Sequence, residues 1–249
     1  MPRHDYLCPA RRAAIRIFLC FSLPCAAALS SATPVWAEGQ SWSVHAFGIK
    51  VGELKLSVSE SPDQYTGTGS FRTTGLAGVL RRIRFTVSSR GRVTSSGYRP
   101  LAYEGEIDTG RRVSETRLDF SGRAPVKTSG AQSPAVPIAE KALRGAHDPM
   151  TVMWQSLKDK TDATLCRLNQ TQFDGTRLVR ITLTNRTGDQ DAVTCSGTYD
   201  RIGGYTADEL AEMKTSPISV SYDRSETGWR ATTIRVETRH GKASLYRQD

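Results

Sequence analysis

The sequence lacks the residue patterns that announce a particular reaction. It has no Gly-x-Ser-x-Gly elbow, no phosphate-cradling glycine loop and no Cys-x-x-Cys pair. None of its histidines has a second histidine at metal-ligand spacing. Proteins that bind single-stranded nucleic acid have runs of aromatic residues interleaved with basic ones, and this sequence has no such run. We therefore expect no catalytic group, metal, cofactor or nucleic-acid partner.

Cysteine is scarce beyond the N-terminus, because three of the five cysteines lie in the first 25 residues. That region places four arginines before an apolar stretch over 17–32, and small residues precede Ala37. This is the pattern of a secretory signal peptide, so we predict that residues 1–37 are removed after Ala37 and that the chain is exported to the periplasm. The apolar stretch is short and interrupted by Pro24, which argues against a membrane anchor, and the same proline argues against lipid attachment at Cys25.

The remaining residues, 38–249, fit one domain. They hold 30 basic and 24 acidic side chains, a net charge of +6 rather than the +9 of the whole chain. Their two cysteines, Cys166 and Cys195, are expected to form a disulfide in an oxidising compartment. A strand running through residues 165–173 would hold these cysteines too far apart. We therefore expect Cys166 to lie in a loop before a shorter strand.

Apolar and polar residues alternate along most of the domain, which is the period of half-buried strands. About ten such segments predict a mainly β fold, a single antiparallel curled sheet or barrel-like structure. One segment has helical spacing instead. Asp148-Pro149 is a helix start, and Met150, Met153, Trp154 and Leu157 follow on one face. A second, shorter helix is predicted after Thr206, where Glu209 completes a capping box.

Residues 121–147 have no apolar period and are rich in Gly, Pro, Ser and Ala. We predict a loop, and its length indicates that it is either flexible or functional.

Acidic residues are missing between Gln64 and Tyr103, a span with seven arginines. If the chain turns near Tyr98, Arg90 and Arg92 lie opposite Glu106 and Glu104, and the turn at 110–111 brings Glu104 opposite Arg117. Such cross-strand pairs would neutralise half of the basic strip. The arginines left over are Arg81, Arg82 and Arg84, a cluster suited to an anionic group.

Two histidines could be read as catalytic. His147 neighbours Asp148, but adjacent residues seldom face each other, and Asp148 is already explained as a helix cap. His45 lies in the first predicted strand, and the sequence indicates no catalytic partner for it. A hydrolase is the function that we favour least, and neither histidine is expected to be needed.

Several short motifs resemble the exported family of unknown function numbered 3108, found in Gram-negative bacteria. The motifs are Phe47-Gly48-Ile49 with Val51-Gly52-Glu53, Thr74-Gly75-Leu76, Asp148-Pro149, Phe173-Asp174-Gly175, and Cys195 followed by Gly203-Gly204-Tyr205. The resemblance implies an envelope location and an antiparallel, barrel-like fold, and it supplies no catalytic residues. The predicted fold is also similar to the helix-plugged curled sheets of periplasmic lipoprotein carriers.

The leading hypothesis is a non-catalytic, monomeric envelope protein that binds a lipid, a lipidated partner or another amphiphile in an apolar groove of the sheet. The predicted groove residues are Tyr65, Phe71, Phe85, Tyr103, Met153 and Trp154, with Arg81, Arg82 and Arg84 at the rim for an anionic head. The alternative is an envelope scaffold that binds another protein through a sheet edge or through residues 121–147.

Overall fold

One antiparallel sheet accounts for most of the structure, a computed structural model that describes residues 36–80, 82–238 and 241–248. The expected signal peptide lies outside these residues except for Trp36 and Ala37, which begin the first strand. The described residues all belong to one compact unit. No helix among the described residues is long and apolar enough to cross a membrane.

Fourteen strands are present in the described residues, against the ten or so predicted. They are β1 (Trp36–Ala46), β2 (Ile49–Glu60), β3 (Gln64–Thr73), β4 (Arg84–Thr94), β5 (Gly97–Asp108), β6 (Val113–Asp119), β7 (Val126–Ser129), β8 (Leu168–Phe173), β9 (Leu178–Leu183), β10 (Asn185–Gly188), β11 (Ala192–Gly203), β12 (Thr215–Ser225), β13 (Gly228–Thr238) and β14 (Gly241–Gln248). The short strands β7 and β10 have mostly exposed side chains. They therefore show no alternation from which the sequence could reveal them.

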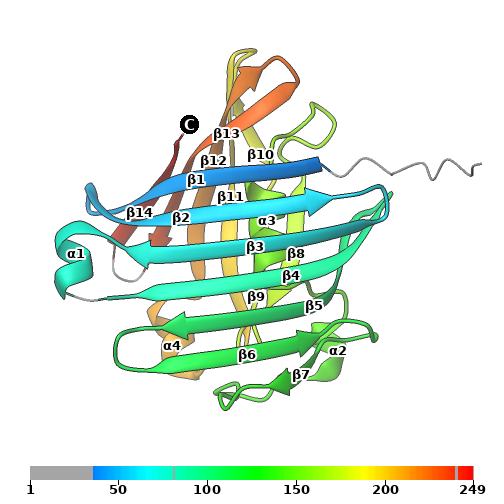
Figure 1. The fold of residues 1–249 in the computed structure, drawn as a ribbon, viewed down its shortest axis with the longest axis vertical. Coiled ribbons are helices and arrows are strands. Elements are labelled where there is room, and N and C mark those ends of the chain that lie inside the picture. The colour runs from blue at the N-terminus through cyan, green and yellow to red at the C-terminus, as the bar shows by residue number, and fades with distance from the viewer. Residues whose placement is uncertain (1–35, 81, 239–240, 249) are drawn as a thin grey trace, which may run out of the picture. The chain divides into compact units, whose positions relative to one another are not determined.

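The sheet is curled and not closed. Its strand order is β7-β6-β5-β4-β3-β2-β1-β14-β13-β12-β11-β9-β8, with β10 paired to β11. Figure 1 shows strands β1–β7 crossing strands β8–β14, with a helix between the two groups. The predicted fold class is confirmed in its coarse form, a mainly β domain with one antiparallel sheet.

The central helix is α3 (Pro149–Leu157), and it begins where the sequence predicts. The Asp148 carboxylate accepts a hydrogen bond from the Thr151 amide at 2.9 Å, and Pro149 occupies the first turn. Met150 and Met153 lie over β3 at Gly67 and Gly69, where an added Cβ would come within 3.1 and 2.9 Å of their methyl carbons. Glycine in β3 therefore makes room for the helix.

Three shorter helices complete the fold: α1 (Gly75–Leu80), α2 (Glu140–Leu143) and α4 (Ala207–Glu212). The capping box predicted at the start of α4 is present, with Thr206 and Glu209 bonded to each other's amides at 3.2 and 2.8 Å. The segment 121–147, predicted as a loop, contains β7 and α2. It is held by the amide of Ala135, which donates to the carbonyl of Gly204, and by Ile138, which packs at Gly203 and Gly204.

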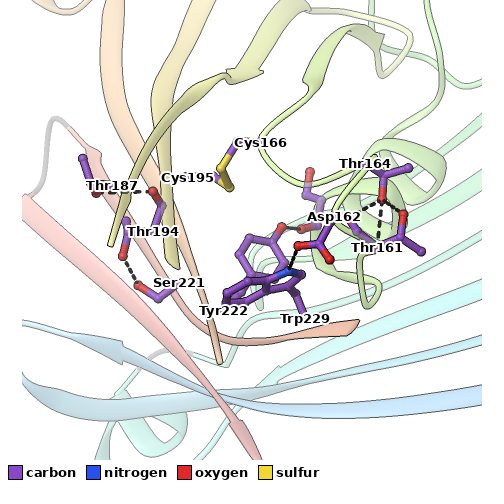
Figure 2. The surroundings of a disulfide bond; sticks show 11 residues. Thr161, Asp162, Thr164, Cys166, Thr187, Thr194, Cys195, Ser221, Tyr222 and Trp229 are labelled. Atoms are coloured by element: carbon purple, nitrogen blue, oxygen red, sulfur yellow. Dashed lines mark hydrogen bonds between the residues drawn. A yellow bond between two sulfur atoms is a disulfide. The ribbon is translucent and has the colours of Figure 1, made fainter. Parts of the chain in front are cut away.

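The disulfide joins Cys166 and Cys195, as predicted (Figure 2). Cys166 precedes the short strand β8, its Cα lies 5.0 Å from that of Cys195, and it adopts a left-handed φ of 52°. Nearby, Trp229 donates to the Asp162 carboxylate at 2.8 Å, and the buried hydroxyl of Tyr222 donates to the Ser156 carbonyl at 2.9 Å. The bridge fastens the segment after α3 to β11, an interior strand that is third from the β8 edge of the sheet.

Part of the predicted ion pairing is wrong. The turn between β4 and β5 falls at residues 95–96 instead of near Tyr98, and a bulge lies between Arg90 and Gly91. Arg90 is consequently opposite Ala102, and Arg92 is opposite Arg99. The predicted pair of Glu104 with Arg117 does form, at 3.6 Å, because the register between β5 and β6 is as expected.

Antiparallel pairing sends successive turns to opposite ends of β1–β7. We call one the helix end: it contains the turns at 61–63 and 95–96 and the connection at 120–125. The other is the rim end, with the turn at 47–48, the connection at 74–83 and the turn at 109–112. In Figure 1 the rim end is at the left, where α1 projects.

Candidate functional site

A pocket of about 650 Å³ opens at the helix end. Four separate segments surround it: the turn between β4 and β5, the connection from β6 to β7, the residues just before α3, and Gln170 of β8. The connection at 120–125 and residues 145–147 lie at the two ends of the segment 121–147, which is predicted to be flexible or functional. The pocket is larger than two hollows of about 500 and 440 Å³, whose linings include several serines.

The pocket wall combines buried, mostly apolar residues with exposed polar and cationic ones. The buried residues that line it are Tyr98, Pro100, Phe120, Ala124, Pro125 and Ala146. Two exposed arginines, Arg99 and Arg123, contribute the charge, and Ser96, Ser121 and Gln170 contribute neutral polar groups. No lining residue is an aspartate or a glutamate. The exposed surface of the pocket is more polar than apolar, so the pocket is suited to a negatively charged ligand that also contacts the apolar side chains at its floor.

His147 lies in the pocket wall and is fixed by its backbone. Its amide donates to the Thr171 carbonyl at 2.8 Å, and its carbonyl accepts from the Phe173 amide at 2.9 Å, so it pairs with the edge strand β8. Its Nδ1 lies 3.4 Å from Oε1 of Gln155. Burial and the positive charge of Arg99 lower the pKa of His147 below its usual 6.5. The ring is therefore neutral at pH 7 and adds no charge to the pocket.

The neighbouring Asp148 faces the core instead of the pocket. Its carboxylate accepts from the hydroxyls of Ser89 at 2.8 Å and Thr151 at 2.6 Å, and the Tyr65 hydroxyl lies 2.6 Å from that of Thr151. Complete burial raises the pKa of Asp148 from 3.8 to about 6. His147 and Asp148 thus have different partners and do not form a catalytic pair.

Tyr98 joins the pocket floor to a second polar network. Its hydroxyl contacts the Glu60 carboxylate and the Lys158 ammonium, and Nε1 of Trp154 donates to Glu60 at 2.8 Å. The ring of Tyr98 packs edge-on against Tyr65, with centroids 5.1 Å apart. Burial and Glu60 raise the pKa of Tyr98, so its hydroxyl stays protonated. These contacts hold the floor in one position.

The six predicted groove residues do not line this pocket. Tyr65, Tyr103 and Trp154 are buried in the core, at 3%, 5% and 2% exposure. The other three, Phe71, Phe85 and Met153, are half-buried and pack against that core, with the rings of the two phenylalanines stacked at 5.4 Å.

The predicted arginine cluster lies at the rim end, away from the pocket. Arg84 and Arg82 both pair with Asp108, at 3.0 and 3.9 Å, and Arg81 lies outside the described residues. Arg99 is one of the seven arginines in the acid-free span, but the sequence predicts no role for it or for Arg123. The usable signals for this pocket were the acid-free span and the unusual 121–147 segment.

No group of three or more His, Cys, Asp or Glu residues that could hold a metal ion occurs in the part of the chain described. His45 approaches the Ser43 hydroxyl at 3.2 Å and packs edge-on against Tyr246.

The open sheet curled around one helix, with its pocket at the helix end, defines this protein as a barrel-like β domain. The family model for the protein of unknown function DUF3108 matches residues 41–206, and the chain belongs to that family. A solved structure with a similar arrangement is a beta-barrel-like protein of the domain of unknown function DUF1849 from Brucella abortus. It is 9% identical, with a TM-score of 0.45 over 87% of this chain and 96% of that one. No curated protein matches the sequence.

Proposed function

We propose that this protein is a non-catalytic binding protein of the bacterial envelope and that its ligand is an amphiphile with an anionic group. The pocket at the helix end carries the proposal, because its charged lining residues are arginines without a carboxylate and apolar side chains lie beneath them at its floor. The proposed binding site is this pocket and not the groove in the sheet that the sequence predicts. The proposed class of ligand is the one predicted from the sequence. Export rests on the signal peptide pattern alone.

Size and chemistry both favour a small ligand. A volume of about 650 Å³ falls within the ordinary range for small-molecule sites, roughly 300–1,000 Å³. The apolar body would contact Phe120, Pro125 and Ala146. Arg99 and Arg123 would face the anionic group, and a planar guanidinium suits both carboxylate and phosphate.

The absence of a catalytic role is proposed from the contacts of the candidate groups. A general base needs a nucleophile within hydrogen-bond reach and a partner that orients its ring. His147 contacts the neutral amide of Gln155. His45 contacts Ser43 of β1, a strand that does not line the pocket. Neither arrangement contains the carboxylate that orients the histidine of a hydrolase.

The test compares a fluorescent fatty acid with the uncharged alcohol of the same chain length. The fatty acid should bind more tightly, and Arg99→Gln combined with Arg123→Gln should weaken it about tenfold or more for each arginine removed. Arg167→Gln combined with Arg180→Gln is the matched control, because these exposed arginines lie outside the pocket lining. Equal affinity for acid and alcohol, or equal loss in the control, would contradict the proposal.

A second ligand experiment addresses the pocket itself. Ser121 is exposed and lines the pocket, so Ser121→Trp should obstruct it without disturbing the core. Loss of fatty-acid binding with an unchanged unfolding midpoint supports the site. Retained binding places the ligand elsewhere.

An envelope scaffold is the second candidate, favoured by two exposed apolar residues in the 121–147 segment. Val126 and Val136 are 61% and 44% exposed. Val126→Asp combined with Val136→Asp should then abolish a discrete crosslinked adduct in cells. Point changes are preferable to deletion, since Ile138 and Leu143 of the same segment pack against the core.

A further inference from the structure

Four large apolar side chains are exposed on the turns of the rim end or beside them. Phe47 is 74% exposed, Ile49 69%, Val113 59% and Ile107 45%. The inner face of the sheet accounts for only one of them: Ile107 lies opposite Phe85 at the end of a row that continues through Phe71 and Leu54. The remaining three have no place in the core.

The turns that carry these residues are neighbours in space. The Phe47 amide donates to Lys242 of β14 at 3.4 Å, and the Thr74 amide at the start of α1 donates to Val51 of β2 at 3.0 Å. At the next turn, an added Cβ on Gly110 would lie 2.9 Å from the carbonyl oxygen of Arg82. One continuous edge, which we call the rim, therefore includes residues 47–53, 72–80 and 82–84, and 107–113, at the left of Figure 1.

Cations outnumber carboxylates along the rim. Each of its two acidic side chains is shared by two cations: Glu53 bonds to Lys50 and Arg72 at 3.0 and 3.2 Å, and Asp108 bonds to Arg84 and Arg82. The exposed Arg111 and Arg112 form no ion pair with the described residues. Six described cations thus accompany two carboxylates. The next carboxylates along these strands, Glu106 and Glu115, lie opposite each other, two residue pairs beyond Asp108 and Val113.

Phe47 occupies a backbone position that does not suit it. Phe47 and Gly48 have φ angles of 52° and 79°, the tight hairpin turn in which both central residues are left-handed. Asparagine and glycine adopt this conformation readily, whereas an aromatic residue is strained there. The ring packs at Gly241 but remains largely in water. A strained, exposed aromatic at the tip of a turn indicates a role outside the fold.

We propose that the rim docks on an anionic lipid surface. Phe47 and Ile49 would enter the boundary between headgroups and acyl chains, with Ile107 and Val113 beside them, while the surrounding arginines contact lipid phosphates. Charge complementarity favours this partner, because the rim has a surplus of four positive charges and the predicted mature chain is itself positive. A neutral protein partner would leave that surplus unused. The proposal is independent of the pocket at the helix end.

The experiment is cosedimentation with vesicles made of equal parts phosphatidylglycerol and phosphatidylcholine, compared with vesicles of phosphatidylcholine alone. The protein should partition to the anionic vesicles and be released by high salt. Phe47→Asn should reduce partitioning about tenfold or more, because it removes the aromatic surface that docking would bury in the membrane. Arg111→Gln combined with Arg112→Gln should reduce it about fivefold for each charge.

Matched controls separate the rim from general surface properties. Val136→Asn changes an exposed apolar residue elsewhere, and Arg167→Gln combined with Arg180→Gln removes two exposed charges outside the rim. These variants should bind vesicles as the unaltered protein does. Asparagine suits the backbone at residue 47, so Phe47→Asn should unfold at the same or a higher urea concentration, which excludes misfolding as the cause of lost binding.

Three outcomes would overturn the proposal. The first is an unaltered protein that ignores anionic vesicles, and the second is equal binding by rim and control variants. The third is a dimer that Phe47→Asn dissociates in the absence of vesicle binding, since the rim would then be a contact between two copies of the chain. Fatty-acid binding in the pocket serves as an independent readout and should be unchanged in every rim variant.

Discussion

The two ends of the strands β1–β7 contain similar types of residue but differ in how far these are buried and in their balance of charge. At the helix end, aromatic rings are buried and their polar atoms have partners, as Tyr98 and Trp154 do with Glu60. At the rim end, Phe47 and Ile49 are exposed, and carboxylates are shared by more cations than they can neutralise. From this difference we expect the residues around α3 to contribute most to the free energy of unfolding. The rim should contribute little to it and is available for surface contacts.

Trp154→Ala should give the largest effect. The indole is 2% exposed and donates to Glu60 at 2.8 Å, so its removal leaves a cavity and a carboxylate without one of its donors. We expect the free energy of unfolding to fall by about 3–5 kcal/mol, measured by urea denaturation. Trp154→Phe, which retains most of the volume, should cost less. If Phe47→Ala cost as much as Trp154→Ala, the two ends would not differ as described.

Asp148→Asn tests the buried charge at the helix end. Because the pKa of Asp148 is raised to about 6, the folded chain keeps this proton to a higher pH than the unfolded chain does. The contribution to stability is therefore complete below pH 3.8 and is lost as pH rises through about 6. This loss is about 3 kcal/mol at pH 7. Urea denaturation between pH 4 and pH 7 should show it in the unaltered protein and not in Asp148→Asn; parallel curves would contradict the assignment.

Phe47→Asn should change stability in the favourable direction. Relief of the left-handed strain should raise the free energy of unfolding by about 1 kcal/mol. Loss of the contact between the ring and Gly241 should offset part of this gain. The same urea measurement applies, with Ile49→Asn as the control, because residue 49 is in ordinary strand geometry. A loss of stability would show that the ring packs more firmly than its exposure indicates.

Arg84→Gln should give the smallest effect. Its pair with Asp108 is exposed, and Asp108 also accepts from the Gly110 amide at 2.8 Å, so the carboxylate keeps a donor. The midpoint of urea denaturation should be unchanged within error. A clear destabilisation would mean that the rim ion pairs are structural, and it would weaken the contrast between the two ends.

Local chemistry explains which features could be predicted from the sequence. The start of α3, the capping box of α4 and the Cys166–Cys195 bridge depend on a few residues with specific bonding or geometry, and all three were predicted. The pairing of Arg90 with Glu106 failed because it depended on the exact turn position and on a bulge at Gly91, which alternation does not reveal.

The pocket was beyond prediction for a different reason. Its lining comes from four segments spread between Ser96 and Gln170. The pairing of β5 with β6 brings two of them together, and the bridge between His147 and Gln172 joins the other two. The left-handed backbone of Phe47 could not be predicted either, since Phe-Gly is not a favoured pair for that turn.

The pairing of β1 with β14 has a consequence for how the domain folds. Nearly all other pairs join strands that are close along the chain, so either half of the sheet can form its hairpins early. The two halves become one continuous sheet only when Ser41–Ala46 meets Ala243–Gln248, a contact across some two hundred residues. Completion of the fold must therefore wait for the last strand. Until it arrives, both β1 and β13 present unpaired edges that another chain could occupy.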